Sequence, residues 1–199
     1  LDNKGTLDKY IGDAIVAFYG APAPVSDHEY WACLTAVKMQ DRLAELREKW
    51  QGEGERWPEI VHHMQNRIGI NTGPMVTGNM GSAMRMNYTM MGDTVNLAAR
   101  LEASAKQYGI YIQVADETYK ACKDKFICRP LDYVIVMGKT DPAQVFELIA
   151  EKGKCPRGYD KLLDAYHQAL GLYRNQEWNK AIEPSKVGDA LAAMFPGCL

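Results

Sequence analysis

An amide and a guanidinium lie four positions apart in residues 87–101, NYTMMGDTVNLAARL. At this i, i+4 spacing Asn96 and Arg100 share one face of a helix, so both side chains can converge on one anionic ligand. The alternative is a solvated polar stripe opposite an apolar core stripe made of Val95, Ala98, Ala99 and Leu101. Taken alone, the segment leaves anion binding and plain solvation both open.

A carboxylate falls at a predicted hairpin turn in residues 7–22, LDKYIGDAIVAFYGAP. The pair Gly12-Asp13 lies between two runs rich in β-branched and aromatic residues, a pattern typical of a β-hairpin with a tight turn. An aspartate at the end of a strand can hold a hard cation. Asp and Gly are also ordinary turn formers, so Asp13 is either a metal ligand or a turn residue on this evidence.

Together and in this order, the two segments resemble the class III nucleotidyl cyclases, the adenylate and guanylate cyclase catalytic domain, over about residues 1–149. The resemblance implies that Asp13 is one of two metal-binding aspartates and that Lys9 contacts the purine of the substrate. It further implies that Asn96 and Arg100 orient the ribose and stabilise charge on the α-phosphate. Thr89, seven residues before Asn96, takes the place of a residue that helps to read the base.

The pair Lys9 and Thr89 is similar to the subgroup of adenylate cyclases that uses Lys and Thr. An ammonium can donate to an adenine ring nitrogen, and a hydroxyl can accept from the exocyclic amine. Guanylate cyclases of the family place Glu and Cys or similar residues at these positions, so the resemblance favours ATP. Thr89 as a plain strand residue, and a guanylate cyclase, are the alternatives.

The family's first metal-binding aspartate lies on a strand before the hairpin, and these 199 residues do not include it. Asp8 is no substitute, because it falls within the hairpin strand. Two Mg²⁺ or Mn²⁺ ions about 3.5 to 4 Å apart need both carboxylates. We therefore expect this chain alone to be inactive. The rival from another class is an inactive cyclase-like module for dimerisation or nucleotide sensing.

Composition excludes several classes of protein. The formal charge is -2 without a Lys/Arg-rich run, which argues against a nucleic-acid surface. No apolar stretch approaches the roughly 20 residues of a membrane span. The 5 cysteines include no CxxC pair and indicate reduced thiols. We expect a cytoplasmic protein, or the cytosolic part of a membrane-anchored or multidomain parent with an upstream sensor domain.

The order of elements predicts an α+β fold with a cyclase domain over residues 1–150 and a helical extension over 151–199. A capping-box signal at Ser26 and Glu29 predicts the start of a long helix. The resemblance implies a ferredoxin-like sandwich that lacks its first strand and helices. The extension resembles one tetratricopeptide-type helix pair, although Pro184 interrupts the pattern of the second helix.

The resemblance also implies a symmetric homodimer with two composite sites. A loop predicted over residues 79–85 is a candidate dimer contact. Three methionines lie in this loop or just beyond it, namely Met80, Met84 and Met86. They either form an adaptable apolar surface for the dimer contact or fill gaps in the core, and the sequence leaves both alternatives open.

Overall fold

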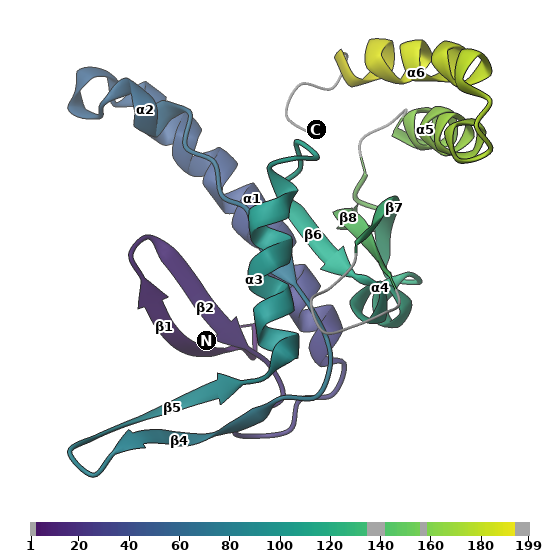
Figure 1. Ribbon diagram of the computed structural model, residues 1–199. Helices are drawn as coiled ribbons and strands as arrows, with labels where there is room; N and C mark the ends of the chain where they lie inside the picture. The colour runs from purple at the N-terminus through teal and green to yellow at the C-terminus, as the bar shows by residue number, and fades with distance from the viewer. Residues whose placement is uncertain (1–2, 135–141, 156–158, 194–199) are drawn as a thin grey trace.

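The computed structural model describes residues 3–134, 142–155 and 159–193 (Figure 1). The strands are β1 Thr6–Ile11, β2 Ala14–Phe18, β3 Ile68–Ile70, β4 Val76–Ser82, β5 Arg85–Met91, β6 Ile112–Ala115, β7 Phe126–Val134 and β8 Ala143–Glu151. The helices are α1 His28–Gly52, α2 Glu59–His62, α3 Asp93–Ala105, α4 Asp116–Cys122, α5 Tyr159–Arg174 and α6 Trp178–Ala193, with a 3-10 turn at Gly54–Arg56.

The central sheet has the strand order β3-β6-β8-β7. β3 is parallel to β6, whereas β8 is antiparallel to both β6 and β7. Side chains of β6 alternate between its faces: Ile112 and Val114 pack with α1 and α4, and Ala115 packs with α3. Each face of the sheet therefore has its own helical layer, and the predicted α+β class is confirmed.

The long helix α1 covers one face of this sheet through the buried side chains of Cys33, Leu34 and Ala36. The capping box predicted for it is wrong. The helix begins at His28, and its N-cap Asp27 has a left-handed backbone with φ 53°. Among the described residues, no side chain forms a capping hydrogen bond there. Oε2 of Glu29 lies 3.3 Å from Nδ1 of His28 instead. None of the described helices is both long and apolar enough to cross a bilayer.

The hairpins β1–β2 and β4–β5 form small sheets of their own (Figure 1). β4 and β5 pair along their whole lengths, and Ala83 and Met84 make the turn between them. The loop predicted over residues 79–85 is therefore wrong for most of its length. Met84 is 96% exposed and Met86 is 60% exposed, so these two methionines belong to the surface and not to the core.

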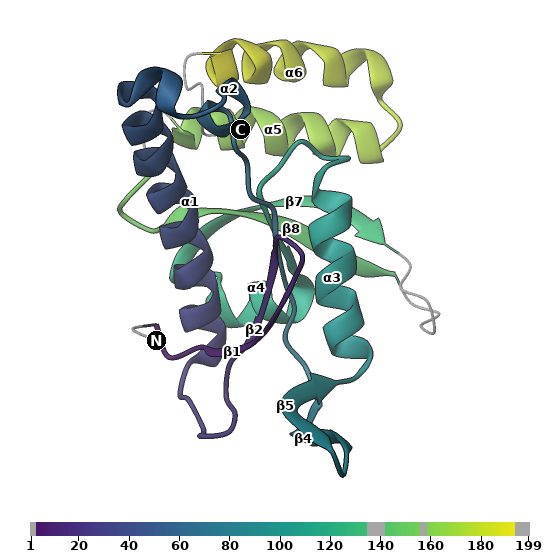
Figure 2. The same cartoon turned by 90° about the vertical axis from the view of Figure 1, so that its left-hand side faces the viewer.

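The helices α5 and α6 pack side by side as a helical hairpin (Figure 2). The inner face of α5 buries Tyr159, Leu162 and Ala165. The hydroxyl of Tyr166 donates to the carbonyl of Pro130 at 2.7 Å, which fixes α5 to β7. Helix α6 continues through Pro184, where the sequence pattern suggested an interruption. The predicted helical hairpin is present, and its tetratricopeptide character stays a prediction.

Candidate functional site

Lys9 and Thr89, 80 positions apart in the sequence, meet in the structure. Lys9 Nζ donates to Thr89 Oγ1 at 3.1 Å. The Thr89 hydroxyl in turn donates to Asp8 Oδ2 at 2.8 Å, and Lys9 Nζ lies 3.4 Å from the same carboxylate oxygen. An ammonium, a hydroxyl and a carboxylate thus form one closed polar cluster between β1 and β5.

A β-bulge in β1 places Asp8 and Lys9 in the same cluster. Lys9 pairs with Val16 while the residue two positions earlier pairs with Ala17, so Asp8 is the extra residue of the ladder. Neighbouring side chains of a regular strand point to opposite faces of the sheet. A bulge sets two residues against one and re-aims a side chain. This local irregularity explains how two adjacent residues both reach Thr89.

The members of the cluster differ in their access to solvent. The side chain of Asp8 is 3% exposed and that of Lys9 is 46% exposed. Thr89 is 9% exposed. A buried carboxylate is costly unless it is paired and hydrogen-bonded, and Lys9 and Thr89 meet both needs. The ammonium of Lys9 is the member of the cluster that a ligand can reach most readily.

Helix α3 presents Asn96 and Arg100 to solvent. Its opposite face is buried and consists of Leu97, Leu101 and Ala105. Asn96 and Arg100 are both exposed, and Arg100 forms no ion pair with any residue that the structure describes. The two side chains share the solvent face of α3 because they lie one turn apart. Their donors are thus available to an external anion.

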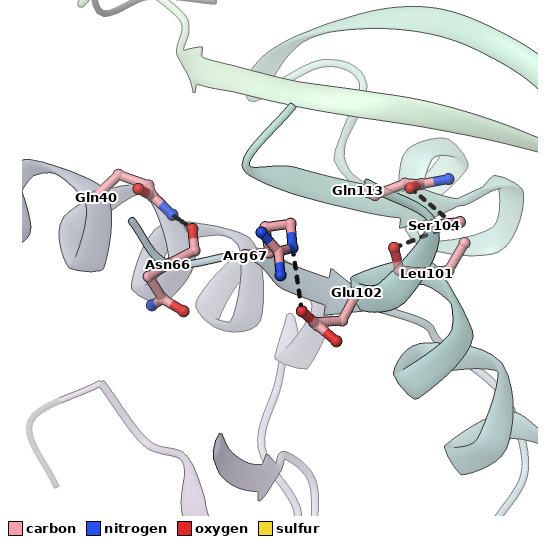
Figure 3. A network of polar contacts seen from close by, with 7 residues as sticks. All are labelled: Gln40, Asn66, Arg67, Leu101, Glu102, Ser104 and Gln113. Atoms are coloured by element: carbon pink, nitrogen blue, oxygen red, sulfur yellow. Dashed lines mark hydrogen bonds and ion pairs between the residues drawn. The ribbon is translucent and has the colours of Figure 1, made fainter. Parts of the chain in front are cut away.

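Polar contacts fix the C-terminal half of α3 against the central sheet (Figure 3). Arg67, just before β3, forms an ion pair with Glu102 of α3 at 3.4 Å. Ser104 of α3 donates from its hydroxyl to Oε1 of Gln113 in β6 at 3.1 Å. Gln113 is fully buried. Helix α3 is therefore anchored to β6 and to the residue that precedes β3, which holds its solvent face in place.

Asp13 lies at the exposed turn between β1 and β2. Gly12 before it adopts φ 62°, a left-handed conformation that favours glycine. Within the described ranges the carboxylate of Asp13 has no hydrogen-bond or ion-pair partner, and no group of three or more His, Cys, Asp and Glu suits a metal ion. Mg²⁺ is often bound by one or two carboxylates together with substrate phosphates. Asp13 can supply one ligand to such an ion, but it does not form a complete metal site by itself.

The structure brings Lys9 into contact with Thr89. Within a single protomer, no hydrogen bond or ion pair among the described residues links Lys9 or Thr89 to Asp13. None links them to Asn96 or Arg100 on the solvent face of α3 either. Asp8 is the member of the cluster that sequence reasoning missed. Its place next to Lys9 gives no signal, since in a regular strand the two side chains would point apart.

Known proteins resemble this chain in sequence and in fold. The pattern of the adenylate and guanylate cyclase catalytic domain matches residues 5–149. Adenylate cyclase 1 of Rhizobium meliloti (strain 1021) is 33% identical over 147 residues, which are 74% of this chain and 21% of that protein. The crystal structure of the adenylyl cyclase CyaB from P. aeruginosa aligns with a TM-score of 0.64 at 30% identity, covering 78% of this chain and 76% of the other.

The guanylate cyclase domain of RhGC from Catenaria anguillulae, solved in complex with GTP, aligns with a TM-score of 0.59 at 28% identity, over 76% of this chain and 75% of that one. The chain spans between 8% and 28% of the lengths of the first curated relatives that it matches. The matched region holds every site residue that the sequence singles out, namely Lys9, Asp13, Thr89, Asn96 and Arg100. By sequence and by fold, the chain belongs to the adenylate and guanylate cyclase catalytic domain family.

Proposed function

We propose that this chain is catalytic machinery of an adenylate cyclase, which converts ATP to 3′,5′-cyclic AMP and pyrophosphate. The contact between Lys9 and Thr89 supports this most strongly, because it joins a donor and an acceptor from distant parts of the sequence at one point. The Lys9 ammonium donates to an adenine ring nitrogen, and the Thr89 hydroxyl accepts from the exocyclic amine. The pair thereby reads the base of ATP.

Asn96 and Arg100 act on the ribose and the α-phosphate. The ribose 3′-hydroxyl gives up its proton to solvent water, and its oxygen attacks the α-phosphorus. The bond from that phosphorus to the bridging oxygen breaks, and pyrophosphate leaves with the electron pair. Asn96 orients the ribose. The Arg100 guanidinium neutralises the charge that builds on the α-phosphate, and it is available for this because no described residue pairs with it. Catalysis then depends on positioning and charge neutralisation, without a protein general base.

Asp13 would hold a divalent cation, Mg²⁺ or Mn²⁺, together with the phosphates of the substrate and a second carboxylate from the family's upstream strand. Two such ions per site would supply charge stabilisation and lower the pKa of the ribose hydroxyl. The carboxylate at the hairpin turn is exposed and has no partner among the residues that the structure describes, so it can supply one ligand of this site.

A homodimer would complete the site. Asp13 of one protomer would face Lys9, Thr89, Asn96 and Arg100 of the other, and twofold symmetry would make the two sites equivalent. The apolar side chains on the β4–β5 hairpin, with Met84 96% exposed and Met86 60% exposed, support an interface on this side of the molecule. We propose a cytoplasmic enzyme, or the cytosolic part of a membrane-anchored or multidomain parent that carries an upstream sensor domain.

A guanylate cyclase is the second candidate, and the fold similarity to a guanylate cyclase domain solved with GTP favours it. Nucleotide assays in the complete enzyme that carries this chain separate the candidates. With Mn²⁺ present, the proposal predicts cyclic AMP from ATP and little cyclic GMP from GTP. Preferred turnover of GTP would support the guanylate cyclase. Binding of either nucleotide without turnover would identify an inactive nucleotide-sensing module and contradict the proposal.

A further inference from the structure

We propose that Asp8 is a specificity-determining positioning residue, which makes the Thr89 hydroxyl an obligatory hydrogen-bond acceptor toward the purine. A purine with an amino group at carbon 6 would then be preferred over one with a carbonyl there. The inference deepens the proposed function, since it concerns the base-reading pair of that same site. It assigns a role to Asp8, which lies outside the base-reading pair of Lys9 and Thr89.

The partners of the Thr89 hydroxyl determine its polarity, that is, which hydrogen bond it donates and which it accepts. A carboxylate only accepts hydrogen bonds, so the single proton of the hydroxyl lies on Asp8 Oδ2, 2.8 Å away. An ammonium only donates, so Lys9 Nζ takes up one lone pair of Thr89 Oγ1 at 3.1 Å. One lone pair of the hydroxyl oxygen remains. A ligand group that meets Thr89 must therefore be a donor.

This polarity separates the two common purines. The exocyclic amine of adenine donates to the remaining lone pair of Thr89 Oγ1. The carbonyl oxygen of guanine or hypoxanthine is itself an acceptor, so it would repel this oxygen and form no hydrogen bond with it. A threonine without Asp8 would lack this preference, because a free hydroxyl rotates and donates as readily as it accepts. Sites built around one hydrogen-bonding polarity reject the wrong partner strongly, since buried polar groups are then left unpaired.

The fold holds Asp8 in the place that this role needs. The bulge in β1 turns its side chain toward Thr89, and only 3% of that side chain is exposed. Water therefore does not compete effectively for the carboxylate oxygen that receives the hydroxyl proton. Lys9 lies 3.4 Å from the same oxygen and compensates its charge. The arrangement fixes the direction of the hydrogen bond before any ligand arrives.

The test compares ATP with ITP, which carries a carbonyl at carbon 6, in the complete enzyme with Mn²⁺. The ratio of kcat/KM for ATP to that for ITP should fall at least about tenfold in Asp8→Ala and in Asp8→Leu, which both remove the acceptor. Thr89→Val should lower the ratio similarly, and Asp8→Ala should change it no further in that background. Asp116→Ala, which removes a surface ion pair with Lys120 of 2.6 Å, is the matched control and should leave the ratio unchanged.

An unchanged ratio in a folded Asp8 variant would overturn the inference, with folding checked by circular dichroism. If neither variant folds, the wild type decides: ITP used within about threefold as efficiently as ATP would contradict a fixed acceptor at Thr89. Equilibrium binding of ATP and ITP gives the same ratio without turnover. Failure to form cyclic AMP would therefore count against the proposed function, while the binding ratio would still test the role of Asp8.

Discussion

At the scale of single residues, the side chains on the solvent face of α3 bear most directly on the chemistry. Asn96 and Arg100 lie one turn apart and are exposed, and Arg100 has no ion-pair partner in the described part of the chain. An exposed guanidinium without an internal partner gives little to the stability of the fold. Its replacement should therefore separate a catalytic role from a structural one.

In the complete enzyme, Arg100→Ala should lower kcat by about a thousandfold, because an arginine at the developing charge of a phosphoryl transfer has effects of this order. The unfolding temperature and the oligomeric state should stay as in the wild type. Steady-state kinetics and size-exclusion chromatography measure these quantities. A loss of kcat smaller than about tenfold would return Arg100 to a solvated surface role.

The base-reading pair gives a second prediction. Lys9→Glu combined with Thr89→Cys replaces the ammonium and the hydroxyl with residue types that resemble those of guanylate cyclases. Because the ammonium no longer donates to an adenine ring nitrogen, kcat/KM for ATP should fall, and use of GTP should rise relative to ATP. Parallel assays of cyclic AMP and cyclic GMP provide the measurement. An unaltered preference for ATP would remove both residues from base recognition.

The candidate site was predictable to different degrees. The shared face of Asn96 and Arg100 follows from helical spacing alone. The partnership of Lys9 with Thr89 came from the resemblance to a family, since no local pattern links residues 80 positions apart. Asp8 was not predictable, because its side chain reaches Thr89 through a bulge, and a strand pattern read from sequence assumes a regular ladder.

At the scale of elements, the close approach of β3 to α3 determines where the solvent face of α3 lies. Gly69 of β3 makes this approach possible: a Cβ atom there would overlap backbone atoms of Ala98 and Glu102 in α3. Backbone atoms of a packed helix cannot move aside without shifting the whole element. The glycine is thus required by packing.

Gly69→Ala should therefore lower the free energy of unfolding by about 1 to 3 kcal/mol, the usual cost of overpacking. Urea unfolding followed by circular dichroism measures this value. Gly171→Ala is the matched control, since no atom of the described residues lies within 4 Å of a Cβ added there, in the last turn of α5. The control should be neutral or slightly stabilising. Equal effects of the two substitutions would contradict close packing at Gly69.

Element types were easier to predict than element boundaries. The predicted long helix and hairpin turn correspond to α1 and to the turn between β1 and β2, because capping and turn residues report the local backbone. The capping box predicted at Ser26 does not form, because Asp27, with a left-handed backbone, takes the N-cap position of α1 in place of Ser26. The loop predicted over residues 79–85 is wrong because β4 pairs with β5 right up to the turn at Ala83 and Met84, and this pairing extends the strands through glycine-containing sequence.

At the scale of the whole molecule, a buried ion pair lies where the helical extension meets the sheet. Arg129 of β7 pairs with Glu147 of β8, and the Arg129 guanidinium stacks 4.7 Å over the ring of Tyr166 in α5. Glu147 is 5% exposed. Burial raises the pKa of Glu147 above its usual value, and the attraction of Arg129 opposes this shift without cancelling it.

The sign of this shift gives a pH prediction. A carboxyl whose pKa is raised in the folded state stabilises the fold most below its unfolded pKa of about 4.3, and this contribution is lost as pH rises through the folded pKa. The stability advantage of the wild type over Glu147→Gln should therefore shrink from acid toward neutral pH. Urea unfolding across this range measures it. An advantage that grows with pH would mean that attraction to Arg129 outweighs burial.

Glu45→Gln is the control for this series, because Glu45 is an exposed carboxyl in a surface ion pair with Arg42. The free energy of unfolding of this variant should run parallel to that of the wild type across the pH range, since surface ion pairs contribute little. A slope in the control equal to that of Glu147→Gln would assign the pH effect to general surface charge.

The central claim is that two copies of the chain assemble one site, with Asp13 from one protomer and Arg100 from the other. Mixing the inactive variants Asp13→Ala and Arg100→Ala of the complete enzyme, under conditions that exchange subunits, tests this claim most directly. Half of the dimers would combine both variants, and each would contain one intact site, so cyclic AMP formation should recover to about a quarter of the wild-type rate. A mixture as inactive as its two components, despite demonstrated subunit exchange, would contradict the shared site.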